Sequence, residues 1–146
     1  MYFTDAHEEL RLHIRKFLEK EMQPHLEEWE EKTFPDSIFQ RMGELGFLGL
    51  RYPQELGGQG GDYFSAIVLS EEMAKAATGG LGMAVAVQTE MATPPVFKFG
   101  TEEQKRRWLA PAIRGEHIAA IAITEPDAGS DVAGITTTAK RYGNEF

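Results

Sequence analysis

The residues whose types and spacing could do chemistry lie in one stretch, positions 121–133. It reads Ile-Ala-Ile-Thr-Glu-Pro-Asp-Ala-Gly-Ser-Asp-Val-Ala. A short apolar run with β character breaks at Glu125-Pro126, and hydroxyl groups stand on either side of this bend at Thr124 and Ser130. Gly129 allows a backbone N–H to come close to a ligand. Such a loop can bind the polar edge of a flat ring and an adjoining phosphate, although on spacing alone a surface loop is the simpler interpretation.

Other patterns that suggest reactive or metal-binding motifs each lack a required residue. The glycines at 57–61 do not have the G-x-G-x-x-G spacing of a dinucleotide site, so we expect an interhelical loop there. His7-Glu8-Glu9 begins like a zinc-protease helix, but Arg11 stands where the second His is needed. Ser130 lacks the G-x-S-x-G frame of a nucleophile, and the four histidines have no metal-ligand spacing. We therefore expect no metal site.

The composition is that of an ordinary globular protein of 146 residues. The formal charge of −8 argues against nucleic acid or an anionic membrane as the main partner. The absence of cysteine excludes disulfides, thiolate metal sites and cysteine nucleophiles. The N-terminus has no secretory signal pattern, and no apolar stretch reaches membrane-spanning length. We therefore expect a cytoplasmic protein.

The elements that must position the loop are predicted to be helical over about 115 residues. Residues 5–32 predict a first helix, with Asp5 and Glu8 as its N-terminal capping box and a break or kink at Pro24. Residues 35–45 predict a second helix that ends at Gly46. Its apolar positions should face inward; these are Ile38, Met42 and Leu45.

Two further helical stretches are expected in the second half of this region. A helix over 63–77 is interrupted by two glycines, and the nearly uncharged residues 81–91 then predict a buried helix that Pro94 and Pro95 end or bend. Thr101 and Gln104 form a capping box for a last helix that runs toward Arg114.

From His117 the pattern changes from helix to strand. Residues 118–123 and 135–140 predict two strands, residues 142–145 a hairpin turn, and Phe146 the start of a return strand. The fold class is thus mainly α, an N-terminal helical bundle at 1–115 followed by an incomplete antiparallel β segment at 116–146. Two strands with an open edge are marginally stable. We therefore expect the chain to be cut, or completed by another polypeptide.

Residues 123–132 closely resemble the flavin signature of the acyl-CoA dehydrogenases, T-E-P-x-A-G-S-D. The resemblance extends along the chain, because further landmarks of that family's helical domain occur in the expected order at 45–50, 55–60, 70–74 and 99–105. It implies the fold of that family: an N-terminal helical bundle, a middle β domain and a C-terminal four-helix domain. It also implies a homo-oligomer, a dimer or tetramer, that binds FAD.

The activity implied by the resemblance is α,β-desaturation of an acyl-CoA thioester to the trans-2-enoyl-CoA, as in fatty acid metabolism. In the family a carboxylate removes the α-proton while the β-hydride passes to the flavin, and electrons leave through an electron-transferring flavoprotein. The enolate oxygen needs preorganised donors during this step. Acyl chain length and branching stay open.

The resemblance also implies roles for individual residues. Ile121 and Ile123 would present main-chain groups to the isoalloxazine edge, and the Thr124 hydroxyl would meet the flavin pyrimidine. Gly129 and Ser130 would meet the FAD pyrophosphate, and Ser130 also the pantetheine arm of acyl-CoA. Residues 87–92 match the helix that lines the acyl-tail pocket. There the candidates are Gln88, Thr89 and Ala92, for which a core-packing role is equally open.

No catalytic residue is expected in this sequence. The family's glutamate base and second flavin strand would lie beyond Phe146, and the family gives Glu125 no base role. Two alternatives therefore stand beside the dehydrogenase. The chain could be a non-catalytic fragment or split subunit that needs a C-terminal partner, or a family relative with oxidase or monooxygenase activity.

Overall fold

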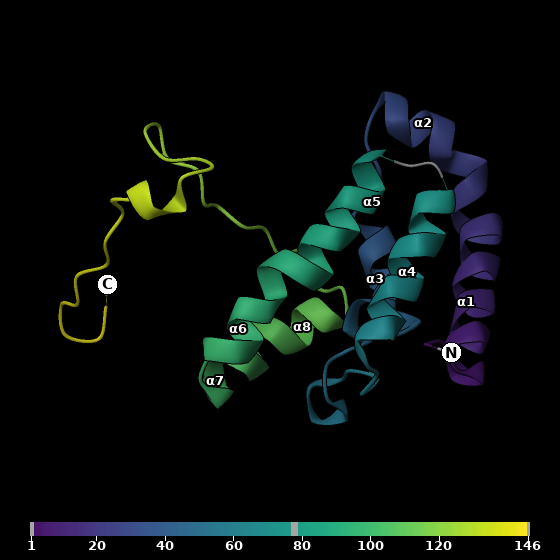
Figure 1. Ribbon diagram of the computed structural model, residues 1–146, viewed down its shortest axis with the longest axis horizontal. Helices are drawn as coiled ribbons and strands as arrows, with labels where there is room; N and C mark the ends of the chain where they lie inside the picture. Colours follow the sequence, from purple (N-terminus) through teal and green to yellow (C-terminus); the bar gives the residue numbers. More distant parts are fainter. Residues whose placement is uncertain (1, 77–78, 146) are drawn as a thin grey trace.

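The helices pack in a bundle, and the chain after residue 116 extends away from it (Figure 1). The computed structural model describes residues 2–76 and 79–145. In chain order the helical elements are α1 (Asp5–Phe17), η1 (Leu18–Met22), η2 (Gln23–His25), α2 (Leu26–Glu31), α3 (Ser37–Glu44), η3 (Phe47–Gly49), η4 (Gln54–Leu56), α4 (Tyr63–Lys75), α5 (Gly79–Ala86), η5 (Val87–Ala92), α6 (Thr93–Phe99), α7 (Glu102–Gln104), η6 (Lys105–Leu109), α8 (Ala110–Ile113) and η7 (Val132–Gly134). Elements η1, η5 and η6 are π-helical, and the other η elements are 3-10 turns.

The start of α1 differs from the expectation. The predicted capping box of Asp5 and Glu8 is wrong, because Thr4 is the N-cap and Asp5 is already helical. His7 makes the reciprocal contact: its Nδ1 accepts the Thr4 backbone N–H at 3.0 Å. Its Nε2 lies 2.8 Å from Oδ1 of Asp62, the residue that caps α4. One imidazole therefore links the starts of two helices.

The break expected near Pro24 is confirmed, since η1 and the proline-containing η2 separate α1 from α2. The cap of α3 is also as predicted, because Gly46 has φ +79° directly after the helix. Ile38 and Met42 are buried as expected. Leu45 is 37 % exposed, so its predicted inward orientation is wrong: it lies at the C-cap, where the chain leaves the helix.

The helix expected to be buried over 81–91 is buried on one face only. Leu81, Val85 and Gln88 are inaccessible, whereas Met83 is 58 % and Met91 41 % exposed. The chain continues through η5 into α6, with Pro94 in the first turn of that helix. The prolines therefore do not end the helical run. The helix predicted from Thr101 is present as α7, η6 and α8. The helix predicted over 63–77 was expected to end at Ala77, which lies outside the described residues.

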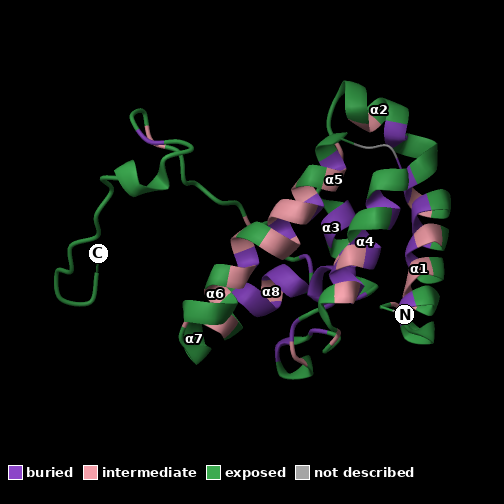
Figure 2. Cartoon of the chain, viewed as in Figure 1, coloured by how far each residue is buried: buried purple, intermediate pink, exposed green. Residues whose placement is uncertain are grey.

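Two apolar cores hold the bundle together, and Figure 2 shows their buried residues on the facing sides of the helices. The larger core joins α1, α3, α4 and α5. The smaller joins α8 and η6 to η4 and the loop before it, and its buried members are Tyr52, Leu56, Leu109 and Ile113. Burial of such side chains supplies the main driving force for the bundle.

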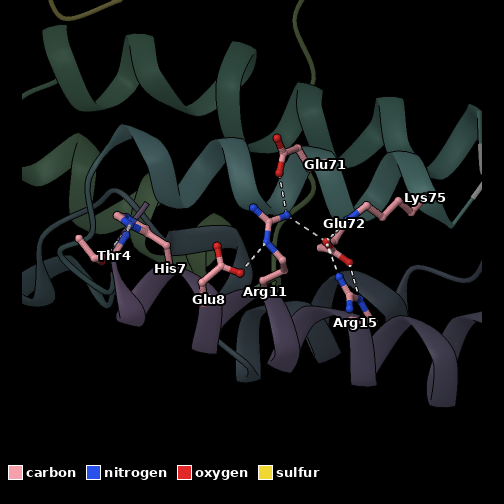
Figure 3. A network of polar contacts seen from close by, with 8 residues as sticks. All are labelled: Thr4, His7, Glu8, Arg11, Arg15, Glu71, Glu72 and Lys75. Atoms are coloured by element: carbon pink, nitrogen blue, oxygen red, sulfur yellow. Dashed lines mark hydrogen bonds and ion pairs between the residues drawn. The ribbon is translucent and has the colours of Figure 1, made fainter. Parts of the chain in front are cut away.

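A buried carboxylate joins α1 to α4 (Figure 3). Glu72 is 1 % exposed and accepts hydrogen bonds from Arg11 at 3.0 Å, from Arg15 at 3.0 and 3.2 Å, and from Lys75 at 2.6 Å. These bonds, that of Arg15 foremost, lower the pKa of the Glu72 carboxyl from 4.5 to about 2 against the opposing effect of burial. The charge is therefore fully paired where water cannot reach it.

The C-terminal segment does not form the two expected strands. Residues 118–123 and 135–140 have no strand structure, and within 116–145 the bridges are Glu125 with Ala128 and Tyr142 with Glu145. The prediction of two strands is wrong, because a strand exists only when a neighbouring strand pairs with it. The turn over 142–145 is present, with Gly143 at φ +63°. The return strand expected at Phe146 lies outside the described residues.

Across residues 2–76 and 79–145, no helix is both long and apolar enough to pass through a lipid bilayer.

We expect Glu72→Gln to lower the free energy of unfolding by about 2 kcal/mol, because it removes the charge that two arginines and a lysine bind. Partial exposure of Arg15 and Lys75 keeps the loss below that of a fully buried pair. Urea unfolding measures it. The pKa of the Glu72 carboxyl is lower in the folded protein than in the unfolded chain. This stabilisation is therefore complete above pH 4.5 and disappears as the pH falls toward 2.

Glu71→Gln is the matched control, since Glu71 is adjacent, 46 % exposed and pairs with Arg11 alone at 2.7 Å. It should cost less than about 1 kcal/mol. Equal losses in the two variants would show that the buried carboxylate has no special role.

Candidate functional site

The five residues expected to contact a flavin lie on one exposed stretch of the C-terminal segment. Ile121 is 41 % and Ile123 48 % exposed, and their neighbours Thr124, Gly129 and Ser130 are also exposed. Figure 2 shows most of the C-terminal segment in green, the colour of exposed residues. The backbone and hydroxyl groups of the five residues are thus accessible to a ligand.

The signature residues form a tight loop rather than an extended chain. The backbones of Glu125 and Ala128 exchange hydrogen bonds of 2.8 and 3.3 Å around Pro126. Ala128 is 4 % exposed and points into the loop. The turn brings Gly129 back to Thr124: a Cβ built on Gly129 would lie 3.9 Å from the Thr124 Cγ2 atom, and beyond its chain neighbours it would meet no other atom of the described residues within 4 Å. The space over the Gly129 backbone is therefore open on the side where a phosphate could approach.

Glu125 makes more hydrogen bonds than the sequence indicated. One carboxylate oxygen accepts the backbone N–H and the hydroxyl of Thr136 at 2.9 and 3.0 Å, and the other accepts the same two groups of Thr137, the N–H at 2.8 Å. These donors, the backbone N–H of Thr136 foremost, lower the pKa of the Glu125 carboxyl to about 2. A carboxylate held in this way is a poor proton acceptor.

Gln88, a substrate candidate, is a buried link between the bundle and the C-terminal segment. The side chain is 1 % exposed. Its Nε2 donates to the carbonyls of Ala112 and His117, both at 3.0 Å, and its Oε1 accepts the Ala119 N–H at 2.6 Å. Both amide hydrogens are used, which favours the core-packing role that the sequence left open. Sequence reasoning missed this role because all three partners lie at least 24 positions away.

Of the other two substrate candidates, Thr89 lines a cavity and Ala92 does not, although both belong to η5. The Thr89 hydroxyl donates to the Val85 carbonyl at 3.0 Å, and Thr89 lines a cavity of about 290 Å³ between α4 and α5. Ala92 is half-buried and does not line that cavity. The lining is mainly apolar: Leu69, Ser70, Met73, Ala74, Gly79, Gly82, Met83, Val85, Ala86 and Thr89.

The structure does not bring the flavin candidates to the substrate candidates. The segment that holds residues 121–133 extends away from α5, as Figure 1 shows. Ser130, expected to contact both ligands, is therefore not beside Gln88, Thr89 or Ala92. In the described ranges no three His, Asp or Glu side chains form a group that could hold a metal ion.

We expect Gln88→Leu to lower the free energy of unfolding by about 2 kcal/mol, because it leaves two carbonyls and one N–H without their partner. It should also speed hydrogen exchange at Ala119, whose N–H bonds to Gln88. Thr89→Val is the control, since it removes a single hydroxyl bond to the same helix. Unchanged exchange at Ala119 in the leucine variant would contradict the link.

Comparison with known proteins supports the assignment that the signature suggested. The sequence profile of "Acyl-CoA dehydrogenase, N-terminal domain" matches residues 4–116. The probable acyl-CoA dehydrogenase YngJ of Bacillus subtilis is 38% identical over 98% of this chain and 38% of its own length. A 3-(aryl)acrylate reductase of Clostridium sporogenes is 37% identical over 100% of this chain and 39% of its own. The chain thus spans under two fifths of the length of these relatives.

The fold agrees with solved structures. The acyl-CoA dehydrogenase from Geobacillus kaustophilus superposes with a TM-score of 0.89 at 41% identity, covering 97% of this chain and 37% of that one. A glutaryl-CoA dehydrogenase from Mycobacterium smegmatis superposes with a TM-score of 0.88 at 31% identity, over 97% and 37% of the two chains. Sequence, signature and bundle agree, and the chain belongs to the acyl-CoA dehydrogenase family.

Proposed function

We propose that this chain supplies the helical domain, residues 1–115, and the first flavin-binding loop of an FAD-dependent acyl-CoA dehydrogenase. The observation that carries the proposal is the loop at 124–131, which holds the family signature with its hydroxyls and its glycine backbone exposed. The remaining residues, 116–146, would belong to the middle β domain.

The donor groups of the loop fit the polar parts of FAD. The Thr124 hydroxyl and the main chain at Ile121 and Ile123 would hold the edge of the isoalloxazine ring. The N–H of Gly129 and the hydroxyl of Ser130 would hold the pyrophosphate, which needs several donors at short range. When bound, FAD would supply the acceptor for the β-hydride of the substrate.

The substrate is proposed to be an acyl-CoA. The cavity between α4 and α5 is lined by apolar side chains and by the hydroxyls of Ser70 and Thr89, which suits an acyl tail better than a charged group. Gln88 and Ala92 would affect the acyl tail indirectly, because they help to set the shape of the helix that bears Thr89. We assign no catalytic residue to the described part of the chain, and the carboxylates of Glu72 and Glu125 are both saturated with donors.

The intact protein is proposed to work as a homo-oligomer in the cytoplasm and to pass electrons to an electron-transferring flavoprotein. A relative from Acetobacterium woodii, 38% identical, is the CarC subunit of a caffeyl-CoA reductase-Etf complex. That relative and the 3-(aryl)acrylate reductase favour a second candidate function, reduction of an aryl-substituted 2-enoyl thioester, in which electrons would pass from the electron-transferring flavoprotein to FAD and then to the substrate.

We expect the intact protein to be yellow, to release FAD on denaturation and to bleach anaerobically when an acyl-CoA is added. Short-chain, long-chain and arylpropionyl thioesters compared in this titration identify the substrate class. Peroxide formed on aeration would indicate an oxidase. A colourless protein without FAD would contradict the proposal and favour a non-catalytic role.

We expect Thr124→Val and Ser130→Ala each to raise the dissociation constant for FAD about fivefold, since each removes one hydroxyl donor worth about 1 kcal/mol. Flavin fluorescence quenching measures the constant in the intact apoprotein. Thr138→Val is the control, because Thr138 is an exposed threonine of the same segment outside the loop. Equal FAD affinities in the wild type and the three variants would show that the Thr124 and Ser130 hydroxyls do not contact FAD.

A further inference from the structure

The signature loop closes upon itself without help from the bundle. Every hydrogen bond found for residues 124–137 joins two residues of that same stretch. The last side-chain bond that ties the segment to the helices is the one between Gln88 and Ala119. The shape of the loop is therefore determined by its own contacts.

The base of the loop is closed by a single side chain. Glu125 stands at one end, and Thr136 and Thr137, eleven and twelve positions later, stand at the other. Each carboxylate oxygen accepts one backbone N–H and one hydroxyl. Both donors of each threonine are thereby directed at one atom, and the β-branched side chains have few other rotamers to adopt.

The interior of the loop depends on this closure. Ala128 is 4 % exposed although it belongs to neither apolar core. It is covered by the returning chain, since a Cβ on Gly134 would lie 3.6 Å from the Ala128 methyl group. The Asp131 side chain accepts the Ala133 N–H at 3.2 Å and starts the η7 turn that brings the chain back.

We propose that Glu125 is a positioning residue whose carboxylate closes the loop at 125–137 and thereby holds Thr124, Gly129 and Ser130 in place for the ligand. Thr124 is the residue directly before the closure, and Gly129 and Ser130 lie within the closed loop. The bonds that order the loop are made before binding, so the ligand does not have to order it. What the loop binds rests on the proposed function; the closure itself does not.

If Glu125 contributed only a negative charge to the surface, its hydrogen bonds would have no explanation. A surface carboxylate that only adjusts the local charge needs no directed donors, whereas Glu125 has two on each oxygen. Glu125→Gln is therefore a sharp test, because it preserves size but turns an NH2 group toward two donors. Thr136→Val with Thr137→Val is the second test: it keeps the carboxylate and the backbone donors and removes the two hydroxyls.

The measurements are hydrogen exchange of the peptides that contain Thr136 and Thr137 in the flavin-free intact protein, and the dissociation constant for FAD. We expect Glu125→Gln to speed that exchange and to raise the FAD dissociation constant, each at least about tenfold. The double valine variant should show smaller changes of the same sign. Glu145→Gln is the control for lost charge, since Glu145 is an exposed carboxylate of the same segment outside the loop.

If Glu125→Gln leaves the hydrogen exchange of Thr136 and Thr137 unchanged, Glu125 does not close the loop. If exchange becomes faster but the FAD affinity stays the same, Glu125 closes the loop but does not position the ligand-binding residues. If the wild-type protein binds no FAD, the proposed function fails together with the flavin part of this inference, while the exchange rates still decide the closure. Circular dichroism of the bundle distinguishes a local change from unfolding. Should Glu125→Gln fail to fold, the double valine variant decides by the same two measurements.

Discussion

The side-chain amide of Gln88 is the interaction on which the placement of the C-terminal segment depends. It is buried, and a buried amide must find partners for its oxygen and both its hydrogens. Those partners are backbone groups of Ala112, His117 and Ala119, at the end of α8 and directly after it. The helix of the substrate candidates and the start of the segment that carries the signature loop are thereby fixed to one another through one residue.

Close backbone contact reinforces the same junction. Gly115 has φ +73°, and a Cβ there would lie 2.0 Å from the Phe39 carbonyl oxygen. On the other side, a Cβ on Gly43 would lie 2.1 Å from the Arg114 carbonyl oxygen. Helix α3 and the end of α8 therefore approach at a distance that side chains would prevent. The segment leaves the bundle from a rigid point although it is itself exposed.

Two glutamates illustrate how burial changes the role of the same chemistry. Glu72 and Glu125 both accept four hydrogen bonds, and both have a carboxyl pKa lowered to about 2. Glu72 lies between two helices out of water, so its pairing contributes to the stability of the whole bundle. Glu125 is partly exposed, where solvent weakens each bond, and its effect is confined to the geometry of one loop.

Local signals in the sequence predicted the helices well, because capping and periodicity involve residues that are three or four positions apart. The Thr101 and Gln104 box is present, with bonds of 3.2 and 2.8 Å, and the cap at Gly46 is as expected. The N-cap of α1 is Thr4 and not the adjacent Asp5, because His7 bonds to Thr4 and is itself held by the distant Asp62. The strands could not be decided locally, since they require pairing partners. For the candidate site, the sequence indicated the loop residues, whereas the contacts of Gln88 and Glu125 came from the folded chain.

The π-helical geometry of η5 has a consequence for how this helix tolerates change in length. A π turn holds one residue more than an α turn. Loss of a single residue between Val87 and Ala92 would convert η5 into an ordinary helical turn and leave the faces of α5 and α6 in register. An insertion elsewhere in α5 would rotate everything beyond it by about 100°. Variation among relatives in the number of residues in this helix would therefore be absorbed at η5, where Thr89 lines the cavity between α4 and α5.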